Sequence, residues 1–294
     1  MKNGNLERTK YFVVAFGSSF LVLLMMALMM VANVQSKQPA SSSAPESSAD
    51  DYYLPRAEDN LNLVLIGSDA KENPARYFFL VRLDAEDGRL PVAALPPQTV
   101  VTYNGKQNTL SELYRLDGAM AVKQALSALF DIPVDRYVTF NGESLVHAVD
   151  SIGYIEYELP APLEYRSEGL SISLAEGPQM VDGKKFYDIL RYPGYANELA
   201  RCAAASDLLA AYINGRLETA LSPQADTLFQ SVINLVDSDL SFGDYDSRRE
   251  ALSFLAKLGG EHANAALVRG AFNTAGDSFT PSQSTLELIL RLYG

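Results

Sequence analysis

The stretch LNLVLIGSD, residues 61–69, decides the fold. It is an almost unbroken apolar run that ends in Gly-Ser-Asp, a pattern typical of a buried strand followed by a turn. Two further apolar runs, residues 77–83 and 90–95, are separated by the turn residues DAEDG and predict two more buried strands. Together the three runs predict the middle of a β-sheet.

Downstream of these runs, helical and strand-like patterns alternate. Thr109 and Glu112 form a capping box at the start of a helical periodicity that reaches Phe130, and Gly118 predicts a break inside it. Residues 99–103, followed by Asn104-Gly105, predict a strand and a hairpin turn. Further strands are predicted at 136–140, 154–159, 170–174 and 265–272, and helices at 143–151, 182–190, 198–219, 224–236, 244–258 and 282–292. We therefore expect an α/β fold, an α-β-α sandwich with helices on both faces of a central mixed β-sheet.

The N-terminal part of the chain predicts a membrane anchor at residues 11–34. No charged residue occurs from Tyr11 to Ala32, and a helix of that length, about 33 Å, can cross a hydrocarbon core of about 30 Å. A cleaved signal peptide is the less favoured alternative, because its apolar region is usually only about 7–15 residues long. The basic residues among residues 1–10 place that end in the cytoplasm and the rest of the chain outside it.

Residues 35–59 are rich in Ser, Ala, Pro and acidic residues, a composition that cannot bury enough apolar surface to order itself. We interpret them as a flexible extracytoplasmic tether. The globular domain is then expected to span residues 60–294, so that the whole chain is a single-pass protein of the cell membrane.

Charge and cysteine content exclude several classes of site. The formal net charge is −12, so nucleic acid is not an expected partner, because phosphate binding needs a basic face. Cys202 is the single cysteine, which excludes an intrachain disulfide, and we expect it to pack rather than act as a nucleophile. His147 and His262 are isolated, so we expect no zinc or haem site.

Several segments in a fixed order resemble the LytR-CpsA-Psr family of cell-envelope proteins. They are LNLVLIGSD at 61–69, FFLVRLD at 78–84, ALPPQTV at 94–100, ALFDIPVDRYVTF at 128–140, AVDSIG at 148–153 and LAEGPQMVDGKKF at 174–186. The resemblance covers residues 60 to the C-terminus.

This resemblance implies a ligase that moves a glycopolymer, such as a teichoic acid or a capsular polysaccharide, from a polyprenyl pyrophosphate carrier onto peptidoglycan. The implied partners are the lipid bilayer, the polyprenyl-phosphate-linked glycopolymer and peptidoglycan. The chemistry needs arginine forks and a divalent cation held by carboxylates to stabilise the pyrophosphate leaving group. It also needs an apolar groove for the prenyl chain.

Part of the family's apparatus is kept in this sequence. By the resemblance, Asp69 matches the first family aspartate, and Arg76 matches the arginine of the Arg-x-Asp element. Arg191 is the first arginine of the Arg-x-Arg element, and Arg201 is the first arginine of the Arg-x-x-Arg-Gln element. We expect these four residues to bind the pyrophosphate head group.

Other family positions have lost their charge. Phe78 stands in place of the second aspartate, so the second carboxylate of a Mg²⁺ site is missing. The remaining replacements of arginine, aspartate or glutamine are Pro97, Gln98, Pro193, Ala204 and Ala205. Loss of one transition-state arginine can cost on the order of 10³-fold in rate. We therefore name no catalytic residue and no metal ligand.

Three functions remain open. The favoured one is a binding or regulatory protein of glycopolymer assembly with weak or lost transferase activity. The second is an active phosphotransferase that uses Mg²⁺, with Asp84 or Glu72 supplying a substitute carboxylate. The third is a structural or regulatory envelope protein with no lipid ligand, in which Asp69 turns the chain, Arg76 is solvated, and Arg191 and Arg201 flank helices.

Overall fold

A computed structural model describes residues 53–294 of the chain. The predicted cytoplasmic end, the predicted membrane anchor and most of the predicted tether lie outside the described residues, so these assignments stay predictions. In the part that is described, no helix combines the length and the apolarity that a membrane crossing requires.

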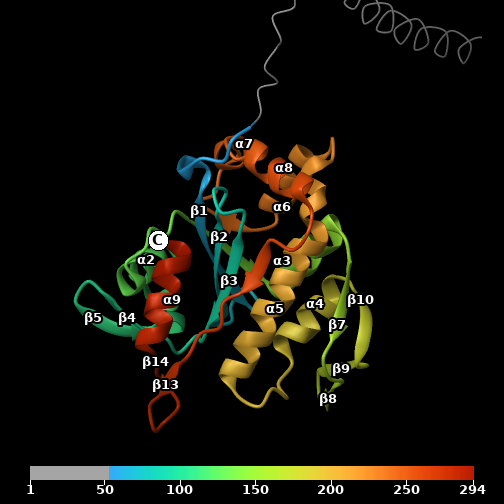
Figure 1. The fold of residues 1–294 in the computed structure, drawn as a ribbon. Coiled ribbons are helices and arrows are strands. Elements are labelled where there is room, and N and C mark those ends of the chain that lie inside the picture. Colours follow the sequence, from blue (N-terminus) through green and yellow to red (C-terminus); the bar gives the residue numbers. More distant parts are fainter. Residues whose placement is uncertain (1–52) are drawn as a thin grey trace, which may run out of the picture. The chain divides into compact units, whose positions relative to one another are not determined.

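A mixed six-stranded sheet lies at the centre of the fold, as the sequence predicts (Figure 1). Its order is β11-β6-β1-β2-β3-β12. The strands are β1 (Leu61–Ser68), β2 (Ala75–Leu83), β3 (Leu90–Leu95), β6 (Arg136–Asn141), β11 (Asp237–Ser238) and β12 (Ala263–Ala265). β1, β2 and β3 form an antiparallel meander, whereas β6 runs parallel to β1 and β12 runs parallel to β3.

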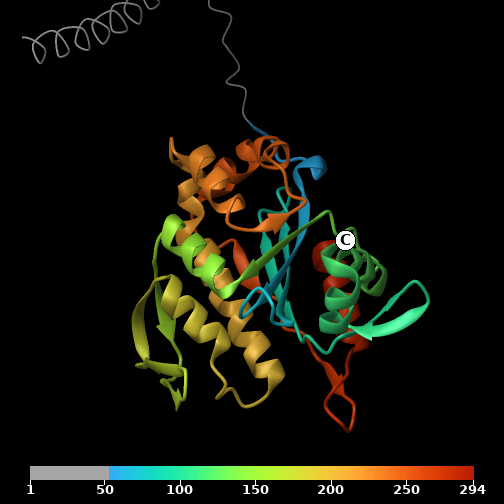
Figure 2. The ribbon, with the colours of Figure 1, turned by 180° about the vertical axis from the view of Figure 1, so that it is seen from behind.

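Helices cover both faces of this sheet, which confirms the predicted sandwich (Figures 1 and 2). One face, here called the closed face, is covered by α2 (Leu110–Phe130) and α9 (Gln283–Tyr293). The other, here called the cavity face, is covered by α3 (Gly142–Ile152), α5 (Glu198–Arg216), α6 (Ala225–Ile233) and α8 (Arg249–Leu258). Alternate side chains of β1 enter the two cores, because successive strand residues point to opposite faces.

The remaining elements are short. They are η1 (Ala57–Asp59), β4 (Val100–Tyr103), β5 (Lys106–Thr109), β7 (Ile155–Leu159), β8 (Leu163–Ser167), β9 (Leu170–Leu174), β10 (Gly177–Val181), α4 (Gly183–Arg191), η2 (Leu217–Leu221), α7 (Phe242–Asp246), β13 (Gly270–Phe272) and β14 (Phe279–Pro281). Asn104 and Gly105 both have positive φ and join β4 to β5, as expected for this hairpin. The capping box at Thr109 is present, and Gly118, with φ 77° and ψ −172°, breaks α2 where the sequence predicts it.

Two sequence predictions in the C-terminal third are wrong. Residues 244–258 form two helices instead of one, because Ser241 and Asp244 cap α7 and the chain turns before α8. The predicted strand at 265–272 is divided, because β12 ends at Ala265 to pair with β3 and β13 starts at Gly270 to pair with β14.

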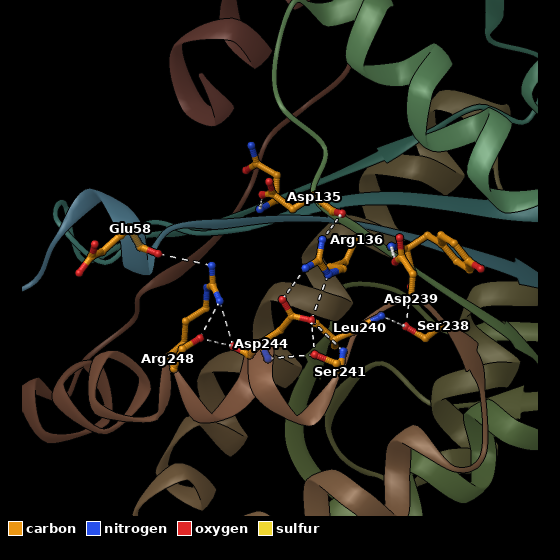
Figure 3. A network of polar contacts seen from close by, with 12 residues as sticks. Glu58, Asp135, Arg136, Ser238, Asp239, Leu240, Ser241, Asp244 and Arg248 are labelled. Atoms are coloured by element: carbon orange, nitrogen blue, oxygen red, sulfur yellow. Dashed lines mark hydrogen bonds and ion pairs between the residues drawn. The ribbon is translucent and has the colours of Figure 1, made fainter.

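A polar network fixes α7 and α8 to the sheet (Figure 3). The Arg136 guanidinium on β6 binds both carboxylate oxygens of Asp244 on α7, at 3.0 and 2.7 Å. Arg248, which precedes α8, donates to the carbonyls of Glu58 and Asn60 at 3.4 and 3.3 Å. Polar contacts therefore hold α7 and α8 in place. Helix α6, by contrast, has no fully buried residue.

Candidate functional site

Asp69 lies directly after β1 and accepts hydrogen bonds from two tyrosines. The hydroxyl of Tyr77 on β2 donates to Asp69 Oδ1 at 2.7 Å, and the hydroxyl of Tyr187 on α4 donates to the same oxygen at 3.1 Å. Arg76 Nη1 lies 3.6 Å from Asp69 Oδ2. The end of β1, the start of β2 and helix α4 thus meet at one carboxylate.

Arg191 is the last residue of α4 and joins this group through Tyr187. Its guanidinium lies over the Tyr187 ring, 4.6 Å from the centroid, a geometry that favours a cation–π contact. Its Nη2 and Nε also bind Asp188 Oδ1 at 2.6 and 3.1 Å. Arg191 is therefore paired with a carboxylate of its own helix.

Arg201 is buried, with 4% of its surface exposed, and it joins the group through Tyr77. Its guanidinium lies 5.4 Å from the Tyr77 ring centroid, and its Nη2 donates to the Arg76 carbonyl at 3.3 Å. Nε binds both carboxylate oxygens of Glu198, at 3.1 and 3.0 Å. The four residues predicted from the resemblance therefore belong to one connected set of contacts.

We call this set the arginine–tyrosine cluster. Its members are Asp69, Arg76, Tyr77, Tyr187, Asp188, Arg191, Glu198 and Arg201. Three guanidinium groups face three carboxylates, and the exposed Lys184 ammonium also binds Asp188, so the cluster together with this lysine carries a net charge of +1.

The pKa values of the cluster keep its hydroxyls protonated. Burial and the neighbouring Asp69 carboxylate raise the pKa of Tyr187 to about 12, and the same causes raise the pKa of Tyr77 further. Burial alone would lower the pKa of Arg201, but the hydrogen bonds to Glu198 and the neighbouring acidic groups together raise that pKa. At neutral pH both tyrosines are therefore donors and Arg201 carries its charge.

The position of Arg201 in its helix contradicts the idea that it merely flanks a helix. It stands in the first turn of α5, where the helix dipole disfavours a cation, and it is excluded from solvent. Arg76, by contrast, is 41% exposed in its side chain, and Arg191 lies at a helix C-terminus, where a cation is favoured. Of the three arginines, Arg201 is the most deeply buried, and its partners Glu198 and the Arg76 carbonyl join α5 to β2.

The sequence analysis missed the tyrosines and the two helical carboxylates of the cluster. A local signal existed for the carboxylates, because Asp188 precedes Arg191 by three residues and Glu198 precedes Arg201 by three. Tyr187 gave no such signal, because it lies 118 residues from Asp69.

The second carboxylate of the family is missing at position 78, and the fold places its possible substitutes as follows. Phe78 is 1% exposed and packs in the closed face, away from Tyr77 in the strand alternation. Asp84 cannot substitute, because it binds Arg89 at 3.2 Å at the opposite end of β2. Glu72 is exposed in the loop after Asp69. Within residues 53–294, no three Asp, Glu, His or Cys side chains are grouped to hold a metal ion.

Cys202 follows Arg201 and is buried, and burial raises the pKa of its thiol to about 12. It therefore stays protonated at neutral pH and has the environment of a packing residue.

Two adjoining apolar cavities lie on the cavity face, between the sheet and the helices. Their volumes are about 380 and 260 Å³. They share five lining residues, which are Ile152, Tyr212, Phe229, Val232 and Leu240. We treat them as one apolar channel.

One end of the channel is lined by residues that adjoin the arginine–tyrosine cluster, although no cluster residue lines it. Phe140 lines this end and stacks near Tyr77, with ring centroids 6.4 Å apart. Phe186 and Leu190 line it from α4, each next to a cluster residue of that helix. Gly67 lies against this ring, because a Cβ at this position would come within 2.3 Å of it and displace Phe140.

The other end of the channel lies at the start of the domain. Leu61 and Arg248 line it, and Arg248 binds the carbonyl of Asn60. The channel therefore runs along β1 past Leu61, Leu63 and Leu65.

A comparison against known families matches residues 24–243 to the LytR_cpsA_psr family. The order of the segments, the fold and the cluster agree with this match. The chain belongs to this family. The predicted family membership is thereby confirmed.

The relatives described next share about a fifth of their residues with this chain. The chain is 21% identical over 267 residues to the polyisoprenyl-teichoic acid–peptidoglycan teichoic acid transferase TagU of Enterococcus faecalis, with 85% of each chain covered. It is 22% identical over 205 residues to an uncharacterized protein of Staphylococcus aureus, a match that covers 68% of this chain and only about half, 51%, of that relative. A crystal structure from Eubacterium siraeum shares the fold at a TM-score of 0.76 and 16% identity, with 87% of this chain and 98% of the other covered.

Proposed function

We propose that this protein binds a polyprenyl phosphate or pyrophosphate that carries a cell-envelope glycan, and that its transferase activity is weak or lost. The observation that carries the proposal is the apolar channel, whose lining residue Phe140 stacks near Tyr77 of the arginine–tyrosine cluster. A prenyl chain in the channel would bring its phosphate beside Arg76, Arg191 and Arg201. The relative TagU is named for a polyisoprenyl-linked teichoic acid, and a ligand of that class has this amphiphilic form.

In this proposal most of the binding free energy comes from the lipid tail. Apolar surface contributes about 25 cal/mol per Å² when it leaves water, and the channel lining is almost entirely apolar. Each arginine of the cluster already faces a carboxylate, so the head group gains by replacing these internal partners. Binding without efficient chemistry follows, because the other carboxylates of the cluster, Asp188 and Glu198, are each paired with an arginine and leave Asp69 without a second carboxylate to hold a divalent cation.

Localisation is part of the same proposal. Residues 1–10 would lie in the cytoplasm, residues 11–34 would cross the membrane, and residues 35–59 would tether the domain outside it. A reporter fused after Gly294 should be active only in an exported position, and activity in the cytoplasm would contradict the envelope function.

An opposed pair of substitutions tests the head-group site. Arg201→Ala should weaken the binding of a short-chain polyprenyl pyrophosphate about tenfold, since a charge-assisted hydrogen bond contributes about 1.5–3 kcal/mol. Glu198→Gln should strengthen it, because it removes the carboxylate that competes for the Arg201 guanidinium. Arg166→Ala, on the exposed part of β8, is the matched control and should change nothing.

The titration uses the full chain in detergent, with the thermal unfolding of each variant measured alongside. Equal affinities in all four proteins, or no binding by the wild type, would refute the proposal and favour a structural role.

An active phosphotransferase is the second candidate, favoured by the meeting of Asp69 with all three arginines in one cluster. It requires Mg²⁺ at Asp69. Calorimetry should show no stoichiometric Mg²⁺ site that depends on Asp69, whereas such a site together with glycan transfer to peptidoglycan would establish the enzyme.

A further inference from the structure

Asp188 of helix α4 is contacted by two cations, one on each oxygen of its carboxylate. The Arg191 Nη2 and Nε atoms both bind Oδ1, at 2.6 and 3.1 Å. The Lys184 ammonium, one helical turn earlier, binds the other oxygen, Oδ2, at 2.5 Å. Arg191 is therefore paired with a single oxygen of this carboxylate.

The ion pair between Arg201 and Glu198 on α5 is built differently. The Arg201 Nε binds both oxygens of Glu198, at 3.1 and 3.0 Å, and its Nη2 also binds Oε1. In residues 53–294, Arg201 is the only basic residue that forms an ion pair with Glu198. Two neighbouring donors on both oxygens form the strong, fork-like pair typical of arginine and carboxylate. Arg201 thus uses both oxygens of its partner, whereas Lys184 denies Arg191 the second one.

The burial of Asp188 makes its second partner important. Its side chain is 4% exposed, whereas that of Glu198 is 22% exposed. Water can therefore replace an arginine at Glu198, but Asp188 is almost closed to it. A buried carboxylate without a partner is strongly unfavourable. When Arg191 turns toward a phosphate, the Lys184 ammonium stays on Asp188 and keeps this carboxylate paired.

The Tyr187 ring keeps Arg191 within the cluster during such an exchange. The Arg191 guanidinium lies 4.6 Å from the ring centroid, and its side chain is 27% exposed. The Tyr187 hydroxyl donates to Asp69, so the ring is held independently of Asp188. Arg191 can therefore release the Asp188 carboxylate and still face the same site.

The position of Lys184 adds little to the stability of α4 itself. It stands in the first turn of the helix, which starts at Gly183, and the helix dipole disfavours a cation there. A lysine four residues before an acidic residue is also the weaker order of a helical ion pair. The contact is better explained by its effect on Asp188 than by helix stability.

We propose that Lys184 is a positioning residue of the head-group site. By holding Oδ2 of Asp188, it prevents this carboxylate from pairing with Arg191 through both oxygens, and the Arg191 guanidinium stays available to a phosphate. The inference rests on the proposed function, in which Arg191 lies beside the head group of a polyprenyl phosphate or pyrophosphate. Lys184 acts through Asp188 and does not itself contact the phosphate.

The test is a titration of a short-chain polyprenyl pyrophosphate into the full chain in detergent. Lys184→Ala should weaken binding about three- to fivefold, because Asp188 can then pair with Arg191 through both oxygens. Lys184→Arg keeps a cation on Oδ2 and should bind as the wild type does. Lys185→Ala is the matched control, because it removes the same charge from a lysine that binds the Met180 carbonyl instead, at 2.9 Å. Its affinity should be that of the wild type.

A double-mutant cycle separates this indirect role from a direct contact with the phosphate. In Asp188→Asn protein no carboxylate competes for Arg191, so adding Lys184→Ala should have no further effect. A direct contact would instead weaken binding equally in both backgrounds. If Asp188→Asn does not fold, Arg191→Ala supplies the second background, in which Lys184→Ala should again change nothing. The thermal unfolding of each variant is measured alongside.

Several results would overturn the inference. They are an unchanged affinity of Lys184→Ala, an equal loss in Lys185→Ala, a Lys184→Arg variant as weak as Lys184→Ala, and a loss that persists in the second background.

The proposed function fails separately. In that case the wild type would not bind the prenyl pyrophosphate, or Arg201→Ala would bind it as tightly as the wild type does. Binding that depends on Arg201 but not on Lys184 would keep the proposed function and reject the role of Lys184.

Discussion

On the closed face of the sheet, Val64, Leu80 and Leu95 are completely excluded from solvent, whereas Leu63 and Leu65 on the cavity face of the same sheet keep part of their surface exposed. Both sets belong to central strands and both are apolar. The strands are therefore not the origin of the difference.

The helices that cover each face explain it. Helix α2 buries seven residues against the closed face, which are Leu110, Leu113, Ala121, Val122, Ala125, Leu126 and Phe130. Helix α6, over the cavity face, buries none. Helix α5, on the cavity face, buries seven residues as α2 does. The comparison teaches that the cavity face is packed under α5 and keeps volume that a ligand can fill under α6.

The largest expected effect comes from introducing a charge into the closed face. Phe78→Asp restores the carboxylate that the family has at this position, yet the side chain would be buried without a partner. We expect a loss of at least about 4 kcal/mol and no gain of Mg²⁺ binding. Denaturant unfolding and calorimetry measure both, with Phe78→Leu as the control for lost volume. A folded, Mg²⁺-binding Phe78→Asp variant would show that position 78 can reach the cluster.

A matched pair of truncations compares the two faces directly. Leu80→Ala should reduce the free energy of unfolding by about 3 kcal/mol, because it opens a cavity in a close-packed core. Leu65→Ala should cost about 1 kcal/mol, because Leu65 already borders a cavity. Urea denaturation of both variants measures the difference, and equal losses would mean that the two faces are equally well packed.

Filling the channel should separate binding from stability. Val232 lines both cavities from α6, so Val232→Phe should place its ring in the shared volume. We expect prenyl pyrophosphate binding to weaken about tenfold while stability changes by less than about 1 kcal/mol. Titration and thermal unfolding measure the two quantities. Val122→Phe on the closed face is the reverse control and should destabilise the domain instead.

The smallest expected effect concerns the ion pair between Arg136 and Asp244, which helps to hold α7 and α8 on the cavity face. Burial would raise the pKa of Asp244, but hydrogen bonds from Arg136 and Ser241 outweigh it and lower that pKa to about 2 from 3.8. The depressed pKa contributes stability above about pH 4, and this stability is lost as the pH falls from about 4 to 2. The pair is partly exposed, so we expect only about 1 kcal/mol.

Hydrogen exchange should then show earlier loss of protection in α7 and α8 than in α9 on acidification. Asp244→Asn removes the titrating group and should abolish this difference, whereas equal exchange at both faces would place the acid-sensitive contacts elsewhere.

Much of the architecture could be predicted from the sequence because the decisive signals are local. The apolar runs of β1, β2 and β3 and the capping box of α2 each act within a few residues. β11 could not be predicted, because two residues carry no periodicity, and β8, largely exposed and polar, lacks the apolar alternation of a buried strand.

The site was partly predictable for a similar reason. Asp69 and the arginines followed from short family motifs, but their contacts join residues far apart in the sequence. Tyr77 and Tyr187 could not be assigned to Asp69 without the fold. The channel was equally invisible, because Leu63 and Leu65 have the same apolar character whether or not a helix packs closely against them.

The carboxylates three residues before Arg191 and Arg201 have a consequence for selectivity. Each is tethered to its arginine on the same helix, and such intramolecular partners act at an effective concentration that free solutes rarely reach. We expect small anions such as inorganic phosphate or sulfate to be rejected at ordinary concentrations. An anion can displace Asp188 and Glu198 from the arginines when a hydrophobic tail in the channel adds to its affinity. The cluster would thus bind a phosphate that carries a lipid tail and reject the same phosphate without one.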